Sequence, residues 1–440
     1  MRIAFFCWEF WPRLVGGLGT YAIEITKKFV EMGHEATVFT LNDGSLPTKD
    51  YWNGIEIHRP MILDSGEIFP IFVREDLKRI KAYAKLLLNL PIKTYRYSKS
   101  SYFLGYPIIR KYLDYFVLYQ NVFNFNFSSF ILLKKYLSRK KFDIISFHDW
   151  LAGFAGIMVK NNTNLPAVFH VHSIEEQRSL GGGSEVVKEI ERESARKADK
   201  IITVSYSMKE FLESLGYPKE KINVVYNGID TEKYSLKNVN WELVEKLRER
   251  YKIKDEKVIF FIGRLTWVKG VANLIRAMPE VLKSFPKTKL IIKSNGPGVT
   301  YLEKVRNSLG LKNKVEIISN WITEEEKIAH YALSDVCVFP SINEPFGLST
   351  LEAMSMERPV VVGARGVSGL REQVIPNGEN RCGVHINGED PNDIAWGIKV
   401  VLENFEEAKK WGKNGRRRVI ENFTIEKTAK ETLKIYESLI

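Results

Sequence analysis

Short apolar runs alternate with longer amphipathic stretches along the first half of the chain. The runs are rich in β-branched and aromatic residues, as buried strands are. We expect strands at residues 3–7, 36–40, 143–147, 167–171, 200–204 and 223–226, with helices between them, for example at 18–32 and 205–215. Because continuous apolar strands that alternate with helices are buried on both faces, the pattern predicts a parallel sheet covered by helices.

The same rhythm starts again near residue 257. We expect strands at 258–262, 289–293, 315–318, 336–340 and 359–362, and helices at 271–284, 300–309, 323–333 and 349–356. The pattern therefore predicts an α/β protein with two doubly wound, Rossmann-like parallel-sheet domains. Asn227 and Gly228 form a turn signal at the end of the first series, so we expect domains at 1–230 and 231–424, followed by a last helix at 425–440.

One segment, at residues 69–141, departs from this alternation. It is rich in Tyr and Phe with Lys and Arg between them. We interpret it as a helical insertion, an acceptor-binding flap, or both. Aromatic residues at helical spacing belong to a core more often than to a binding surface, so packing is the favoured role.

The composition agrees with two ordinary globular domains. The chain has 440 residues, of which 45% are hydrophobic and 27% charged. The net charge of +12 is spread among 53 acidic residues, and no nucleic-acid-binding motif appears, so we expect no nucleic-acid partner. We assign the excess of positive side chains mainly to the solvated surface, and we expect some of them to face phosphate groups in a cleft.

The cysteines and the apolar runs bear on the compartment. Cys7, Cys337 and Cys382 are widely spaced and form no metal-ligand motif, so we expect reduced core thiols in a cytoplasmic protein. The apolar start of the chain is too short for a signal peptide and is better explained as a strand. No apolar run has the length of a membrane span, and we expect no integral membrane association.

A glycine-rich loop follows the first predicted strand. Gly16, Gly17 and Gly19 surround Leu18, where a helix begins. Glycines at a helix N-terminus let backbone N–H groups approach an anion, although a plain tight turn would have the same composition.

Two cations follow the first strand of the second series. Arg264 offers a planar set of donors, and Lys269 adds a point charge five residues later. Ligands bind at the carboxyl ends of strands in α/β sheets. This pair, flanked by Gly263 and Gly270, therefore predicts a pyrophosphate site.

A loop between a strand and a helix carries two carboxylates. Glu344 precedes the helix and is suited to accept hydrogen bonds from sugar hydroxyls, and Glu352 lies inside the helix, where it is suited to bind a ribose. Gly347 between them allows close approach of a ligand to the helix N-terminus.

Histidines end two strands of the first domain. His148-Asp149-Trp150 follows one strand, and His170 and His172 end the next. Alternation puts His170 and His172 on one face, but no third ligand is evident, so we expect no metal there. We expect His170 to be a hydrogen-bonded core histidine and His172 to be the functional one. The chain also lacks an Asp-x-Asp motif, and no metal or other cofactor is expected at the diphosphate.

In this order, the motifs resemble the retaining glycosyltransferases of the GT-B fold, families 4 and 5, and most closely the glycogen and starch synthase branch. The most specific stretches are 263–270 and 344–354. The resemblance implies two Rossmann-like domains that face each other across a cleft, with the last helix packed back onto the first domain. It also implies the transfer of glucose from ADP-glucose or UDP-glucose to the non-reducing end of an α-1,4-glucan, with retention of configuration.

The resemblance further implies roles for single residues. Catalytic roles fall to His172, Arg264, Lys269, Glu344 and Asp149. The donor would contact Gly16, Gly17, Leu18, Asn295, Trp321, Ile322, Phe346, Gly347, Leu348 and Glu352. The acceptor would contact Glu9 and Trp150.

Other functions stay open at this point. A GT-B transferase with a small sugar or lipid acceptor, which would make trehalose, sucrose phosphate or a mannosyl product, carries similar motifs. The stretch at 8–12 and the His-Asp-Trp motif favour the synthase branch. A non-catalytic subunit that binds sugar nucleotides would not need the cations and carboxylates together. The sequence also leaves a homo-oligomer possible.

Overall fold

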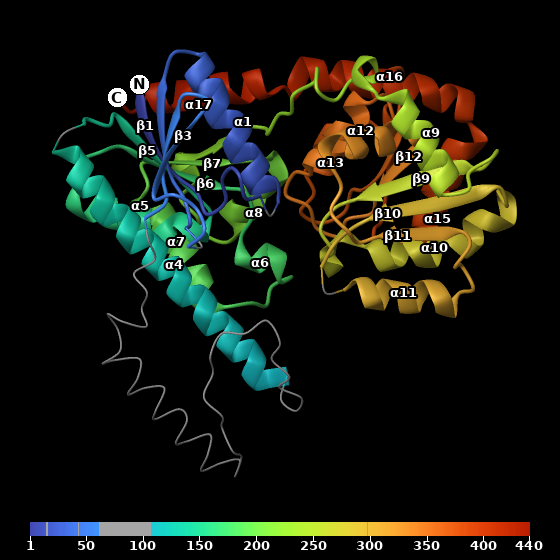
Figure 1. Cartoon of the computed structure of the whole chain (residues 1–440), viewed down its shortest axis with the longest axis horizontal. Coiled ribbons are helices and arrows are strands. Elements are labelled where there is room, and N and C mark those ends of the chain that lie inside the picture. The colour runs from blue at the N-terminus through green and yellow to red at the C-terminus, as the bar shows by residue number, and fades with distance from the viewer. Residues whose placement is uncertain (15, 43, 61–106, 139, 297) are drawn as a thin grey trace, which may run out of the picture.

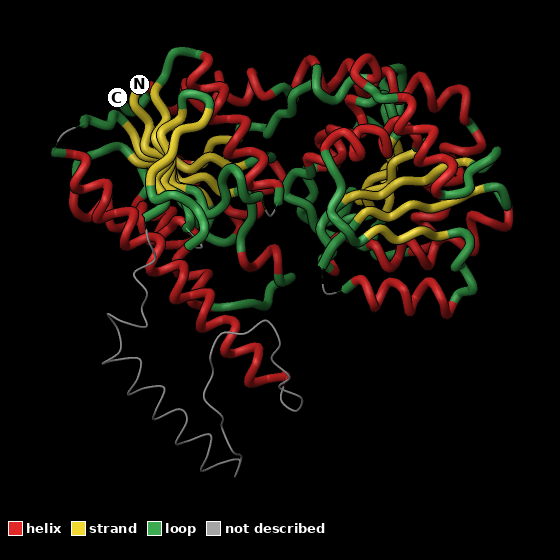
Figure 2. Tube along the Cα trace, viewed as in Figure 1, coloured by secondary structure: helices red, strands yellow, loops and turns green. Residues whose placement is uncertain are grey.

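The computed structural model describes residues 1–14, 16–42, 44–60, 107–138, 140–296 and 298–440. Two lobes lie side by side, and each is built around one sheet (Figure 1). The strands form the middle layer of each lobe, and helices cover them (Figure 2). This confirms the predicted fold class, an α/β protein with two doubly wound parallel-sheet domains.

The first sheet has eight strands in the order β3-β4-β2-β1-β5-β6-β7-β8. They are β1 (Arg2–Phe6), β2 (Glu35–Phe39), β3 (Lys49–Trp52), β4 (Ile55–His58), β5 (Ile144–His148), β6 (Ala167–Val171), β7 (Lys200–Thr203) and β8 (Ile222–Val224). All neighbouring pairs are parallel except the β3–β4 hairpin. Every residue of β5 and β6 is buried, as expected for central strands covered on both faces.

The helices of this domain are α1 (Gly17–Glu31), α4 (Pro107–Leu137), α5 (Gly153–Asn162), α6 (Glu175–Arg178), α7 (Glu185–Lys197) and α8 (Tyr206–Ser214), with the 3₁₀ turns η1 (Trp150–Ala152) and η2 (Lys219–Lys221). Helix α1 buries Ala22, Ile25, Thr26 and Phe29, which recur at helical spacing and form its core face. The hydroxyl of Ser205 caps α8 by accepting a hydrogen bond from the backbone N–H of Met208.

The second sheet has six parallel strands in the order β11-β10-β9-β12-β13-β14. They are β9 (Lys257–Ile262), β10 (Thr288–Lys293), β11 (Val315–Ile318), β12 (Val336–Phe339), β13 (Val360–Gly363) and β14 (Gly383–Ile386). The helices are α9 (Trp241–Arg250), α10 (Val271–Ser284), α11 (Val299–Ser308), α12 (Glu324–Leu333), α13 (Leu348–Ser355), α14 (Leu370–Gln373), α15 (Pro391–Glu403), α16 (Phe405–Asn422) and α17 (Ile425–Glu437), with the 3₁₀ turns η3 (Leu236–Asn238) and η4 (Trp267–Lys269).

The predicted strands agree with the observed ones to within two residues at each end, but β3, β4 and β14 were not predicted. Strand β3 is polar, and the burial along it alternates between exposed and half-buried residues. Asn53 and Gly54 connect it to β4, with φ angles of 47° and 77°. Two consecutive positive φ angles belong to the hairpin turn that Asn-Gly favours, so the turn was the signal for this hairpin.

Helix α4 accounts for part of the predicted insertion at 69–141, of which 69–106 lies outside the described residues. Its side chains at Phe125, Phe130 and Leu133 are buried in the core of the first domain. The side-chain amide of Asn126 donates to the carbonyl of Leu151 at 2.8 Å and accepts from the backbone N–H of Ala155 at 2.8 Å. Over this half of the helix, packing is therefore confirmed.

The sequence also led to expectations about the cysteines and about membrane-spanning segments. Cys7, Cys337 and Cys382 are buried free thiols, as expected. Among the described residues, no helix combines the length and the hydrophobicity that a membrane span requires.

The chain passes between the lobes twice, and the two passages are hydrogen-bonded to each other. The N–H of Ile229 donates to Phe423, and the N–H of Ile425 donates back to Ile229, at 2.9 Å and 3.1 Å. A Cβ at Gly228 would lie 2.1 Å from the carbonyl carbon of Thr424, so only glycine permits this approach. Helix α17 then returns to the first domain, where it lies against α1 (Figure 1).

A carboxylate clasps the two domains next to these passages. Glu372 of α14 accepts hydrogen bonds from the backbone N–H groups of Tyr206 and Ser207, at 2.9 Å and 2.7 Å. It also accepts one from the hydroxyl of Tyr226 at 2.9 Å. An anion from the second domain thus satisfies the N-terminus of α8 in the first.

We predict that Glu372→Ala lowers the free energy of unfolding by about 1–2 kcal/mol, since the first N–H groups of α8 lose their acceptor. Urea and thermal unfolding measure the change. Glu379→Ala is the matched control, because Glu379 is exposed and its side chain makes no recorded hydrogen bond in the described structure. Equal midpoints for the two variants would contradict the clasp.

Candidate functional site

The site lies where the carboxyl ends of the two sheets approach each other. All the motif loops follow strands of the two parallel sheets, and parallel strands present their carboxyl ends at one edge. Loops from both lobes gather between the sheets (Figure 2). Residues far apart in the sequence therefore meet at this seam.

The glycine loop of the first domain touches the second domain. A Cβ at Gly16 would lie 3.1 Å from the guanidinium carbon of Arg264, so the absence of a side chain lets the guanidinium lie against the loop. A Cβ at Gly17 would lie 3.8 Å from the side chain of Leu348, at the start of α13. Three residues that the sequence assigned to the donor site, with Arg264, thus come together.

Glu9 contacts the glycine loop. We predicted that it contacts the acceptor, but its carboxylate accepts a hydrogen bond from the N–H of Gly16 at 2.8 Å. A Cβ at Gly19 would lie 2.9 Å from the same carboxylate. Glu9 therefore holds the glycine loop in place, and a role toward the acceptor stays a prediction.

Lys269 and Glu344 form an ion pair. Lys269 ends η4, and Glu344 lies in the loop after β12, where the hydroxyl of Ser341 also donates to its carboxylate at 3.3 Å. Gly270 makes this approach possible, because its φ is +67° and a Cβ there would lie 2.0 Å from the carbonyl oxygen of Pro340. The ammonium group of Lys269 is thus held by the carboxylate of Glu344 in the loop after β12.

The backbone around Glu344 is held on both sides. Its N–H donates to Val367 at 3.0 Å, and its carbonyl accepts from Gly369 at 2.9 Å. Gly347 has a φ of +97°, and a Cβ there would lie 2.6 Å from the side chain of Leu370. The turn into α13 therefore depends on glycine.

Glu352 is buried inside the second domain with two partners. It accepts from the ammonium of Lys327 at 3.0 Å and from the hydroxyl of Tyr331 at 2.8 Å. Burial acts to lower the pKa of Lys327, but the carboxylates of Glu352 and Glu324 raise it overall, so the lysine is charged. Neither partner was predicted, since both lie on α12 and the sequence gives no sign that this helix faces α13.

The other predicted donor-binding residues differ in how far their side chains are exposed. Trp321 is 78% exposed and is therefore accessible for stacking, whereas Ile322 beside it is buried. Asn295 is exposed, and its carbonyl accepts from the N–H of Leu265 at 3.2 Å, which joins the loops after β9 and β10. The ring of Phe346 is buried between Tyr226 and Phe423. Only its backbone is placed for a ligand contact.

Three histidines gather at the ends of β5 and β6. His148, His170 and His172 place ligand atoms within 4.8 Å of one another, so His148 is a third candidate ligand that was not evident from the sequence. The sheet register sets His148 beside His170. The three rings are stacked, with interplanar angles of 18–28°. Nitrogen lone pairs of stacked rings lie in nearly parallel planes, an arrangement poorly suited to converge on one ion.

Asp149 fixes the backbone that carries His172. It has a φ of +54°, which is uncommon for a residue with a side chain. Its carboxylate accepts from the N–H of His172 at 2.7 Å and from that of Ser173 at 3.4 Å. This geometry shows a direct positioning contact with His172, while the predicted role toward the acceptor stays open.

A cavity of about 320 Å³ adjoins this region and is lined by Trp150. Its other walls come from Leu118, Tyr119, Glu175, Arg178, Ser179 and Val187. Arg178 donates to the hydroxyl of Ser173 at 2.9 Å, which places the cavity next to the His172 loop. Arg178 also pairs with Glu175 and Glu191, at 3.1 Å and 2.9 Å. Sequence reasoning missed Arg178, because a single arginine in a polar helix carries no signal.

The carboxyl group of Glu191 pairs with Arg178 of the cavity wall and is buried. Burial raises its pKa to about 7, although Arg178 acts in the opposite direction.

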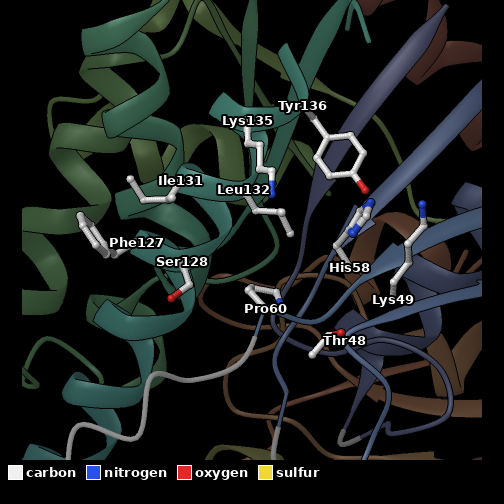
Figure 3. A pocket seen from close by; sticks show the side chains of 10 residues that line it. All are labelled: Thr48, Lys49, His58, Pro60, Phe127, Ser128, Ile131, Leu132, Lys135 and Tyr136. Carbon is white, nitrogen blue, oxygen red and sulfur yellow. The ribbon is translucent and has the colours of Figure 1, made fainter. Parts of the chain in front are cut away.

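A second hollow, of about 440 Å³, lies at the other edge of the first sheet. Figure 3 shows Phe127, Ile131 and Lys135 of α4 on one side of it and Lys49 and His58 of the β3–β4 hairpin on the other. None of its lining residues was singled out as a site residue, although those on α4 belong to the segment 69–141, for which an acceptor-binding flap was one interpretation. Strands β3 and β4 lie at the sheet edge opposite β8. The hollow is therefore separate from the seam.

Two protein-family models match the chain. "Glycosyltransferase Family 4" matches residues 94–233, and "Glycosyl transferases group 1" matches residues 244–418. An uncharacterized glycosyltransferase of Methanocaldococcus jannaschii is 31% identical over 99% of this chain and 98% of its own length.

Characterised relatives differ in their products. An α-maltose-1-phosphate synthase of Mycolicibacterium smegmatis is 30% identical over 67% of this chain and 79% of its own length. A glycogen synthase of Mycobacterium tuberculosis is 25% identical over 99% of this chain and 94% of its own length. Among solved structures, sucrose-phosphate synthase of Thermosynechococcus elongatus has a TM-score of 0.76 at 21% identity, and the match covers 100% of this chain and 98% of that one.

We predict that His148 and His170 stay neutral as the pH falls through ~6.5, where a free imidazole takes up a proton. Burial lowers the pKa of both, and the neighbouring imidazoles lower it further. In the unfolded chain the same rings take up protons near pH ~6.5. Stability that is complete above this pH is therefore lost as the pH falls below it. Histidine ring resonances measure this by NMR, with the urea-unfolded chain as control, and titration of both folded rings near pH ~6.5 would contradict it.

Proposed function

This chain belongs to the glycosyltransferases with the GT-B fold, and on that premise we propose that it is a retaining glucosyltransferase. The donor is ADP-glucose or UDP-glucose, and the acceptor is the non-reducing end of an α-1,4-glucan. The observations that carry the proposal are the contacts of Gly16 with Arg264 and of Gly17 with Leu348, and the ion pair of Lys269 with Glu344 in the loop that leads to Leu348. Backbone N–H groups and two cations at one seam form a site for a diphosphate.

Lys269 and Arg264 act on the leaving group in this proposal. As the bond between the anomeric carbon and the phosphate oxygen breaks, its electron pair passes to the nucleoside diphosphate. The cations stabilise the negative charge that develops there, and fixed charges act strongly at a site from which water is excluded. Glu344 holds the ammonium of Lys269 in place before the donor binds.

Retention of configuration follows if the acceptor attacks from the face that the diphosphate leaves. The acceptor oxygen forms the new bond to the anomeric carbon, and its proton passes to the departing phosphate oxygen. No protein nucleophile and no metal ion are required for this sequence of events. His172 and Asp149 lie on the first-domain side, where the acceptor would bind.

The cavity beside His172 supports a neutral sugar as acceptor. Trp150 and Tyr119 provide aromatic walls, and the carboxylate of Glu175 in the same wall already accepts hydrogen bonds from the protein. Arg178, the one cation that the described residues place in this wall, already pairs with two carboxylates. A phosphorylated acceptor would find little uncompensated positive charge there.

A transferase with a small acceptor is the second candidate. The observation in its favour is the α-maltose-1-phosphate synthase relative, whose name gives a small phosphorylated product. A non-catalytic subunit is disfavoured, because the cations, Glu344 and the His172 loop all lie at the same seam.

A donor and acceptor screen tests the proposal. ADP-, UDP- and GDP-sugars are offered with glycogen, maltooligosaccharides, glucose and sugar phosphates, and nucleotide release and product are measured with and without EDTA. We expect glucan extension that EDTA does not reduce. Transfer only to a sugar phosphate or lipid would support the second candidate, and loss of activity in EDTA that Mg²⁺ restores would overturn the metal-free reaction.

We predict that Lys269→Ala lowers kcat by about 100-fold or more, because one stabiliser of the leaving-group charge is lost. Steady-state kinetics with the donor identified in the screen measure the change. Lys246→Ala is the control, since Lys246 is a highly exposed lysine on α9 with only a surface ion pair. Turnover of Lys269→Ala equal to that of the control would exclude the role.

A further inference from the structure

A chain of hydrogen bonds runs from the last helix of the protein to His172. Tyr436, on α17, is fully buried in the core of the first domain, between α1 and the sheet. Its hydroxyl lies 2.8 Å from Nε2 of His170 and donates to the hydroxyl of Ser146 at 2.8 Å. Figure 1 shows α17 along this lobe, although the chain reaches it only after the whole second domain.

The series of hydrogen bonds continues through residues of β5. The Ser146 hydroxyl lies 2.8 Å from Nε2 of His148, and Nδ1 of His148 lies 3.1 Å from Nε2 of His172. Ser146, His148 and His170 have essentially no exposed surface, whereas His172 is half-buried and lies at the seam. Three consecutive hydrogen bonds thus connect the buried Tyr436 to the predicted functional histidine, and a fourth connects Tyr436 to His170.

The number of protons available for donation fixes which group donates in each of these hydrogen bonds. A hydroxyl has one proton to donate, and a neutral imidazole has one N–H and one acceptor nitrogen. Because Tyr436 donates to Ser146, it must accept from Nε2–H of His170. Ser146 then donates to Nε2 of His148, which leaves the His148 proton on Nδ1, from where it is donated to Nε2 of His172. The proton of His172 is therefore on Nδ1.

Neutral rings are a condition of this count, and the surroundings provide it. Burial keeps the pKa of His148 and of His170 well below its ordinary value, and it lowers the pKa of His172 as well. The ring planes are held by neighbours, since His148 packs at a tilt against Phe5, with 4.1 Å between ring centroids, and His172 packs edge-on against Tyr21, with 4.6 Å between centroids. Rotation of either ring would break this series of hydrogen bonds.

We propose that Tyr436 is a positioning residue that, through Ser146 and His148, fixes the tautomer of His172 with its proton on Nδ1. His172 then presents an N–H donor, and not a lone pair, on the nitrogen that His148 does not contact. The consequence for turnover rests on the proposed function, in which His172 faces the reacting sugar. The tautomer itself does not depend on that function.

In this proposal α17 does more than cover the first domain, because it supplies the hydroxyl of Tyr436. If α17 only covered an apolar face, as Ile425, Ala429 and Leu433 do, a phenylalanine would serve at position 436 equally well. The hydroxyl instead satisfies two buried polar groups, which would be costly to leave unpaired.

Histidine tautomers measured by NMR test the proposal directly. The full chain is labelled with ¹⁵N-histidine, and long-range ¹H–¹⁵N spectra distinguish protonated from unprotonated ring nitrogens. We expect the wild type to carry the His172 proton on Nδ1. We expect Tyr436→Phe and Ser146→Ala, each of which interrupts the chain, to populate the other tautomer. A wild-type proton on Nε2, or unchanged spectra in both variants, would overturn the proposal.

Kinetics provide the second measurement. We expect both variants to lower kcat by about tenfold, as for the loss of one buried hydrogen bond, with KM for the nucleotide sugar changed less than about twofold. Tyr217→Phe is the matched control, because Tyr217 is also a buried tyrosine of this domain and its hydroxyl has no hydrogen-bond partner in the described part of the chain. An equal kcat loss in this control would mean that only packing is involved and would contradict the proposal.

The two measurements separate this proposal from the transferase assignment. If the screen finds no sugar transfer, the tautomer of His172 and its response to Tyr436→Phe are still measurable. If transfer is found and the tautomer does not respond, the assignment stands and the positioning role fails.

Discussion

The paired crossings between the domains are the constraint on which the rest of the structure depends. Ile229 exchanges backbone hydrogen bonds with the chain at 423–425, and Gly228 makes this contact possible because it has no side chain. The two passages hold the carboxyl ends of both sheets at one seam. They also direct α17 back onto α1, so the same contact places the donor-side loops and completes the core of the first domain.

The charged groups at the seam are held in place by partners of the protein itself. Glu344 pairs with Lys269, Glu352 is held by Lys327 and Tyr331, and the carboxylate of Asp149 accepts backbone N–H groups. A site arranged in this way does not need to reorganise when charge develops on a ligand. Electrostatic stabilisation is most effective when the groups that provide it are already in position. The histidine chain applies the same principle to a neutral group, since it fixes the position of a proton and not that of a charge.

Much of the fold could be predicted, because long apolar strands alternating with amphipathic helices have few other arrangements. The exceptions have physical reasons. Strand β3 is polar and lies at a sheet edge, so its hydrogen bonds, and not its hydrophobicity, define it. The buried face of α4 was visible as spaced aromatic residues, but its contact with α5 depends on Asn126, a polar residue that no apolar pattern indicates.

The sequence by itself determined which loops carry chemistry, because glycines, cations and carboxylates directly follow strands, and the carboxyl ends of parallel strands lie at one edge. Only the tertiary structure decided the partners of these groups. Tyr436 and Ser146 are 290 positions apart, and Gln177 of the first domain meets Asn343 of the second at 2.5 Å across 166 positions. Hydrogen bonds require contact within about 3 Å, and spacing along the chain does not reveal such contact between distant residues.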